Sequence, residues 1–110
     1  MTQYRIIVTP DASDDLYELR SYIADVLCSP DTALSYIRAV RKEIAALSEM
    51  PARYRPVDDE PWHSRGIRRF LVKNSFVYYR IDEAAGVIYI LNIIYAACDQ
   101  LRALSEMKTD

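Results

Sequence analysis

Few side chains in this sequence have the chemistry of a catalytic or metal-binding group. The single histidine, His63, could act as a general acid or base near neutral pH, and any mechanism that needs two histidines is excluded. No pattern places a carboxylate or nucleophile beside it, so we expect a surface histidine in a loop. Three consecutive acids, Asp58, Asp59 and Glu60, converge on a cation only if the loop curves around it. A solvated acidic turn is therefore the simpler prediction.

Positive charge is concentrated in one part of the chain. Residues 53–80 contain seven cations and three acids, a net charge of +4, whereas the rest of the chain contains seven cations and 13 acids, a net charge of −6. The seven cations are Arg53, Arg55, Arg65, Arg68, Arg69, Lys73 and Arg80. We predict that they build a basic, target-binding face.

Aromatic residues accompany these cations. They are Trp62, Phe76, Tyr78, Tyr79 and Tyr95. Arginine beside aromatic rings suits phosphate contact with base stacking, and it suits equally a protein interface anchored by Tyr, Trp and Arg. Composition leaves both alternatives open. For any single arginine, a solvated side chain or a weak surface ion pair is the commoner role.

Metals and nucleotide cofactors are not expected. Cys28 and Cys98 have no Cys or His partner at the spacing of metal ligands, so we expect each to be a small buried apolar residue. The only glycines are Gly66 and Gly86, which excludes a P-loop and a GxGxxG fingerprint. We therefore predict no cofactor and no metal.

The length and hydropathy indicate one domain that spans residues 1–110. No run approaches the roughly 18 apolar residues of a membrane span, and the first ten residues lack the apolar core of a signal peptide. We predict a cytoplasmic protein without membrane contact.

The first half of the chain predicts a strand and two helices. Residues 4–9 are rich in β-branched side chains and predict a strand that ends at Pro10, and we expect Asp11 to start the helix that follows. Its apolar face is Ala12, Leu16, Leu19, Ile23 and Val26. Ser29 and Pro30 predict the cap and first turn of a second helix, which ends near Met50 because Pro51 forbids continuation. The two helices should form an antiparallel hairpin.

The second half predicts a loop over 52–65 and three consecutive antiparallel strands over 67–72, 76–82 and 87–95. The last strand is apolar at nearly every position, so it should be central in the sheet. Alternation places Arg68 and Arg69 on opposite faces, and we expect Tyr79 to be buried. The predicted fold is α+β with the order β-α-α-β-β-β, an antiparallel sheet packed on a helical hairpin, and a short C-terminal helix after Asp99.

Several short strings follow one another along the chain in a characteristic order. They are residues 4–9, Pro10-Asp11-Ala12, Asp15-Leu16, Tyr22-Ile23, Ser29-Pro30, Ala33, Leu47 with Pro51, Gly66-Ile67-Arg68-Arg69, Tyr79-Arg80-Ile81-Asp82, and residues 90–95 with Asp99. In these strings and their order the chain resembles, over nearly its whole length, the RelE/ParE superfamily of bacterial type II toxins. The resemblance implies a growth-arresting toxin that a cognate antitoxin neutralises, in a complex that can be a hetero-oligomer.

Two targets are open within this resemblance. RelE-like members cleave messenger RNA on the ribosome, and the residues that could serve such an endoribonuclease here are His63, Arg68 and Tyr95. However, Phe76, Ala96 and Ala97 stand where RelE-like members carry cations. We therefore favour a ParE-like toxin, which inhibits DNA gyrase without nuclease chemistry. A degenerate protein that keeps the fold and only binds a partner is a third hypothesis, favoured by the Ala96-Ala97 pair.

Overall fold

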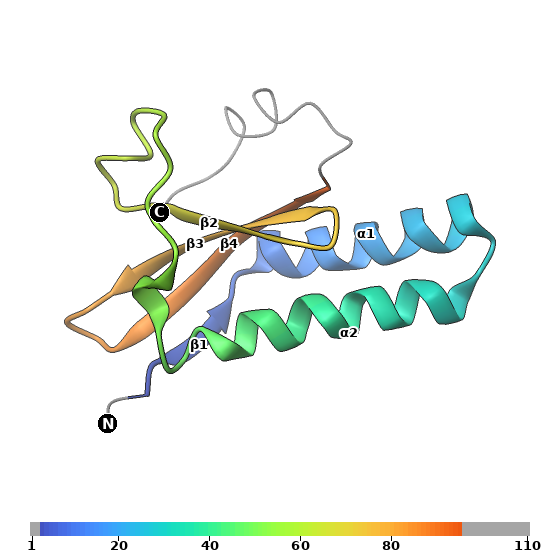
Figure 1. Cartoon of the computed structure of the whole chain (residues 1–110), viewed down its shortest axis with the longest axis horizontal. Coiled ribbons are helices and arrows are strands. Elements are labelled where there is room, and N and C mark those ends of the chain that lie inside the picture. Colours follow the sequence, from blue (N-terminus) through green and yellow to red (C-terminus); the bar gives the residue numbers. More distant parts are fainter. Residues whose placement is uncertain (1–2, 96–110) are drawn as a thin grey trace.

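Two helices lie against one face of a four-stranded sheet in the computed structural model (Figure 1). The structure describes residues 3–95. The elements are, in chain order, β1 (Arg5–Val8), α1 (Pro10–Leu27), α2 (Pro30–Ala46), the short 3-10 helix η1 (Pro51–Arg53), β2 (Arg68–Val72), β3 (Ser75–Asp82) and β4 (Val87–Tyr95). This order confirms the predicted β-α-α-β-β-β arrangement. The predicted C-terminal helix lies outside the described residues, as do Cys98, Ala96 and Ala97.

The sheet is mixed, with the strand order β1-β4-β3-β2. The three C-terminal strands are antiparallel, as expected, and β4 is central. However, β1 pairs with β4 in parallel, from Arg5 opposite Val87 to Val8 opposite Ile90, so the prediction of an antiparallel sheet was wrong for this strand. The helical hairpin between β1 and β2 forms a connection long enough to carry the chain from one edge strand of the sheet to the opposite edge strand.

The helix ends differ in part from the prediction. The side-chain oxygen of Thr9, not Asp11, caps α1 by accepting a hydrogen bond from the backbone N–H of Ala12, and Pro10 occupies the first turn. Asp11 instead lies inside the first turn, where its charge complements the helix dipole. Ser29 caps α2 as predicted. Because α2 ends at Ala46, several residues before Pro51, the predicted end near Met50 was too late.

Most apolar helix positions face the sheet, and we call the sheet face that the helices cover the inner face. The inner core contains Ala12, Leu16, Leu19 and Ile23 from α1, Ala33, Ile37, Val40, Ile44 and Leu47 from α2 and the turn after it, and Phe70, Val72, Val77, Tyr79, Ile88, Ile90 and Ile93 from the sheet. Val26 is an exception, since 58% of its surface is exposed near the end of α1. Cys28, predicted to be buried, is also exposed, because it lies in the connection between the two helices.

The opposite, outer face of the sheet has a smaller core of its own. Val57 and Ile67, at the two ends of the loop before β2, pack with Tyr78 and Leu91 of the sheet. Trp62, from the middle of that loop, packs against this cluster. Tyr79 is buried as predicted, and Tyr78 is buried as well, because the two neighbours point to opposite faces that are both covered.

Candidate functional site

Two of the predicted target-binding cations are held by backbone carbonyls near the end of α2. Arg53 donates hydrogen bonds from Nε to Met50 O at 3.1 Å and from its terminal nitrogen to Ala46 O at 2.9 Å. Arg68 donates to Tyr54 O at 2.6 Å. A guanidinium at a helix C-terminus satisfies carbonyls that have no partner within the helix and complements the helix dipole. Arg53 therefore has a structural role in ending α2.

Two other cations lie over aromatic rings of the sheet. The guanidinium carbon of Arg69 is 4.6 Å from the centroid of the Phe76 ring, and that of Arg80 is 4.9 Å from the centroid of the Tyr89 ring. Phe76 and Tyr89 both pack against the outer core, so these two arginines belong to the outer face. Lys73 is exposed in the β2–β3 turn with a φ of 55°. Stacking therefore fixes Arg69 and Arg80 on the outer face, and the target-binding role of the basic face stays a prediction.

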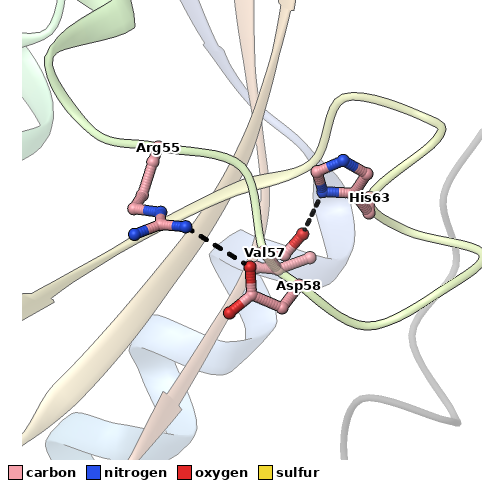
Figure 2. A network of polar contacts seen from close by, with 4 residues as sticks. All are labelled: Arg55, Val57, Asp58 and His63. Carbon is pink, nitrogen blue, oxygen red and sulfur yellow. Dashed lines mark hydrogen bonds and ion pairs between the residues drawn. The ribbon is translucent and has the colours of Figure 1, made fainter.

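The loop before β2 uses its polar groups to hold its own shape. Figure 2 shows the exposed ion pair between Arg55 and Asp58 at 3.6 Å and the contact between His63 Nδ1 and Val57 O at 2.7 Å. Glu60 accepts hydrogen bonds from the backbone N–H and the hydroxyl of Ser64, which lower the pKa of Glu60. Arg65 is exposed in the same loop.

The three consecutive acids do not converge on a metal site. Asp58 pairs with Arg55, and Glu60 binds Ser64. Among residues 3–95, no group of three His, Cys, Asp or Glu residues could hold a metal ion. Within the same range, no helix is long and apolar enough to cross a membrane.

The structure does not bring the three candidate catalytic residues together. Arg68 stands opposite Tyr79 and Tyr95 opposite Ser75, so they are four residues apart along β3 and lie on strands at its two sides. The strand rise and spacing then put their Cα atoms about 16 Å apart. Tyr95 instead packs on Tyr22 of α1 with ring centroids 5.5 Å apart. His63 belongs to the loop that covers the outer face, whereas Tyr95 packs against the inner core.

Comparisons with known proteins give the family. The family model described as ParE toxin of type II toxin-antitoxin system, parDE, matches residues 6–99. The chain belongs to the ParE toxin family. The predicted relationship to the RelE/ParE superfamily is thereby confirmed, and the ParE branch that we favoured is the one that matches.

Solved structures share the ParE family fold. A chain from the chromosomal ParDE toxin–antitoxin system of Pseudomonas aeruginosa matches with a TM-score of 0.69 at 20% identity, covering 84% of this chain and 96% of that chain. A chain of the Mycobacterium tuberculosis RelBE2 toxin–antitoxin complex matches with a TM-score of 0.62 at 23% identity, covering 89% and 97%. A mutant of the Escherichia coli toxin RelE in the free state matches with a TM-score of 0.62 at 10% identity, covering 92% of each chain. No curated protein matches the sequence.

A half-buried polar cluster of this ParE family toxin was not predicted from the sequence. Oδ2 of Asp15 accepts hydrogen bonds from the backbone N–H of Ile93 at 2.9 Å and from Asn92 Nδ2 at 3.2 Å. Burial raises the pKa of Asp15, and the two hydrogen bonds oppose that rise. The carboxylate takes the place of a strand partner, because β1 ends at Val8 and does not reach Ile93. A carboxylate next to Leu16 in the sequence gives no sign of this role.

Tyr79 ties the sheet to the segment after α2. Its hydroxyl donates a hydrogen bond to Pro51 O at 2.7 Å in a buried setting. Burial raises the pKa of Tyr79 to about 12, while the nearby Arg68 acts in the opposite direction. The rings of Tyr54 and Phe70 stack beside it at 4.7 Å. Arg68, a candidate catalytic residue, therefore lies among groups that fix the fold.

Proposed function

We propose that this toxin arrests growth by inhibiting DNA gyrase, that it does so by binding rather than by catalysis, and that a cognate antitoxin neutralises it. The observation that carries this proposal is the separation of Tyr95 from Arg68 and from the loop that holds His63. The toxin would act in the cytoplasm, where gyrase and DNA are located, and would need no cofactor.

Cleavage of RNA makes demands that this arrangement does not meet. A base must take the 2′-hydroxyl proton, an acid must protonate the leaving group, and cations must balance the developing charge, all around one phosphate. Here the tyrosine and the arginine are about 16 Å apart by strand geometry. His63 Nδ1 is already engaged with Val57 O. Inhibition by binding requires a complementary surface only, and Arg69, Lys73 and Arg80, with Arg55 and Arg65 from the loop, are the cations we propose for it.

The test compares two purified systems. The toxin is added to gyrase holoenzyme with relaxed plasmid and ATP, and in parallel to ribosomes translating a defined messenger RNA. We expect loss of supercoiling and an intact message. Cleavage of the message at a ribosome-dependent position, with supercoiling unchanged, would overturn the gyrase proposal. No effect in either system and no growth arrest would leave a fold that only binds a partner.

Variants of the candidate catalytic residues sharpen this comparison. His63→Gln and Tyr95→Phe remove a base or an acid without leaving a large cavity, and both are expected to inhibit gyrase as the wild type does. A nuclease that used either residue would lose cleavage by about 100-fold or more. Growing cells give the same distinction, because gyrase inhibition should stop thymidine incorporation before amino-acid incorporation.

The antitoxin proposal draws on the complexes among the structural relatives, one from a ParDE system and one a RelBE2 toxin–antitoxin complex. We expect the toxin and its antitoxin to form a hetero-oligomer whose mass, measured by light scattering, exceeds that of either chain. The complex should leave gyrase active. A mixture that stays as separate chains would contradict the pairing.

A further inference from the structure

The tip of the β2–β3 hairpin carries an apolar row bracketed by two cations. Leu71 stands opposite Phe76 on β3, and Phe76 stands opposite Ile94 on β4, so the three side chains form a row across three strands of the outer face. Arg69 precedes Leu71 by two residues, and Lys73 follows it by two. We call Arg69, Leu71, Lys73, Phe76 and Ile94 the hairpin patch.

The hairpin patch is exposed at its centre. Leu71 has 57% of its surface exposed, although it lies in a strand, and Arg69 and Lys73 are exposed on either side of it. β2 is also an edge strand of the sheet. An exposed leucine on an edge strand is a liability for a protein without a partner there, and exposed apolar groups rimmed by polar ones mark binding surfaces.

The hairpin patch is also held rigidly. The hydroxyl of Tyr36 on α2 accepts a hydrogen bond from the backbone N–H of Asn74 at 2.9 Å and lies 2.7 Å from the hydroxyl oxygen of Ser75, which is buried. Arg69 is fixed over the Phe76 ring at 4.6 Å. A surface whose side chains are already in place loses little conformational entropy on binding, so a small patch can contribute strongly to affinity.

The chemistry of the hairpin patch selects a protein segment as its partner. Side chains two residues apart in a strand are about 7 Å apart, which is the spacing of Arg69 and Leu71 in β2, and Lys73 follows them in the turn. A segment with an acidic and an apolar side chain at alternate positions, followed by a second acidic side chain, complements this row. The phosphate backbone of a nucleic acid would satisfy the cations, but Leu71 would meet an apolar group only where bases are reached in a groove or in a single strand, so a protein segment fits this row more simply.

From this arrangement, and resting on the proposed function, we infer that the toxin docks on gyrase through the hairpin patch, which receives an acidic–apolar–acidic segment of the gyrase surface. The charge distribution supports this orientation. Outside residues 53–80 the chain has a net charge of −6, so an acidic partner is repelled elsewhere and attracted to this region.

The experiment measures binding of the toxin to gyrase holoenzyme by biolayer interferometry, with wild type and matched variants. Leu71→Ser and Arg69→Glu alter the hairpin patch, and each is expected to raise Kd about tenfold or more. Val26→Ser and Arg38→Glu are the controls. Val26 is exposed to 58%, much like Leu71, and Arg38 is an exposed arginine on α2. The controls should bind within about twofold of wild type, and circular dichroism should show all four variants folded.

Each other outcome has a distinct meaning. Wild-type toxin that neither binds nor inhibits gyrase overturns the proposed function together with this inference. Wild-type inhibition with unchanged binding by the hairpin-patch variants overturns this inference alone. Variants that self-associate but bind gyrase normally would also overturn this inference alone, because Arg69 would then serve to protect the edge strand. Variants that no longer bind the antitoxin but still bind gyrase would overturn it as well. Equal loss in the control variants, or patch-dependent binding to a duplex DNA without gyrase, also overturns it.

Discussion

The hydroxyl of Tyr79 offers a sharp test of how the sheet is joined to the helical hairpin. Tyr79→Phe keeps the buried ring and removes the hydroxyl, whose proton Pro51 O accepts at 2.7 Å and which also contacts the backbone of Tyr54. Tyr79 has no exposed surface, so water does not replace the lost donor. Leaving a buried carbonyl without a partner lowers the free energy of unfolding by about 1–3 kcal/mol. We expect a loss of about 2 kcal/mol at pH 7.

The same hydroxyl predicts how this loss changes with pH. Because burial raises the pKa of Tyr79 from 10.0 to about 12, the folded state holds the phenolic proton above the pH at which the unfolded chain releases it. The contribution of Tyr79 to stability is therefore full below pH 10 and is lost as the pH rises from 10 towards 12. Each pH unit in this interval costs the wild type at most about 1.4 kcal/mol relative to the phenylalanine variant.

Urea unfolding followed by circular dichroism at pH 7 to 11 measures both effects. The free energy of unfolding of the wild type should exceed that of Tyr79→Phe at pH 7, and this difference in free energy should shrink above pH 10. Tyr17→Phe is the matched control, because 73% of Tyr17 is exposed, and it should change the free energy of unfolding by less than about 0.5 kcal/mol. A loss below about 0.5 kcal/mol for Tyr79→Phe at pH 7, or a difference that stays constant to pH 11, would refute the reasoning.

Three further substitutions test other parts of the fold by urea unfolding. Because partial burial raises the pKa of Asp15 above the usual 3.8, the free energy of unfolding of the wild type should fall relative to Asp15→Asn as the pH rises from 3.8 to neutrality; the opposite slope would contradict this cause. Thr9→Ala removes the cap of α1 and the hydrogen bond to Ile90 O, and should cost about 1–2 kcal/mol; an unchanged midpoint would show that neither contact matters. Ile90→Ala empties a fully buried position of the central strand and should cost about 2–5 kcal/mol, whereas a loss below about 1 kcal/mol would mean that the core collapses around the gap.

The features that local chemistry determines were predicted correctly. Ser29 and Pro30 gave the start of α2, and the apolar run of the last strand gave its central place, because caps and burial act within a few residues. The parallel pairing of β1 depends on contacts about 80 residues apart, for which the sequence has no periodic signal.

The candidate site was harder to predict for a related reason. Strand alternation correctly placed Arg68 and Arg69 on opposite faces of the sheet. It could not show that Arg68 binds Tyr54 O while Arg69 lies over the Phe76 ring. The polar role of Asp15 arises where β1 stops short of Ile93, which is a property of the assembled sheet.

The irregularity in β4 explains why that strand shows no clean alternation. Opposite Tyr78 and Tyr79 of β3 stand Asn92 and Ile90, so Leu91 is an additional residue in the ladder. Ile90 before it and Ile93 after it both reach the inner core, three residues apart instead of two or four. The strand thus consists of two regularly alternating segments, and the additional residue between them shifts the inward and outward alternation by one position. A deletion of Leu91 would restore a regular ladder and would leave Ile93 opposite Val77 in the inner core, but it would take Leu91 out of the outer core. The additional residue is therefore what allows β4 to supply side chains to both cores.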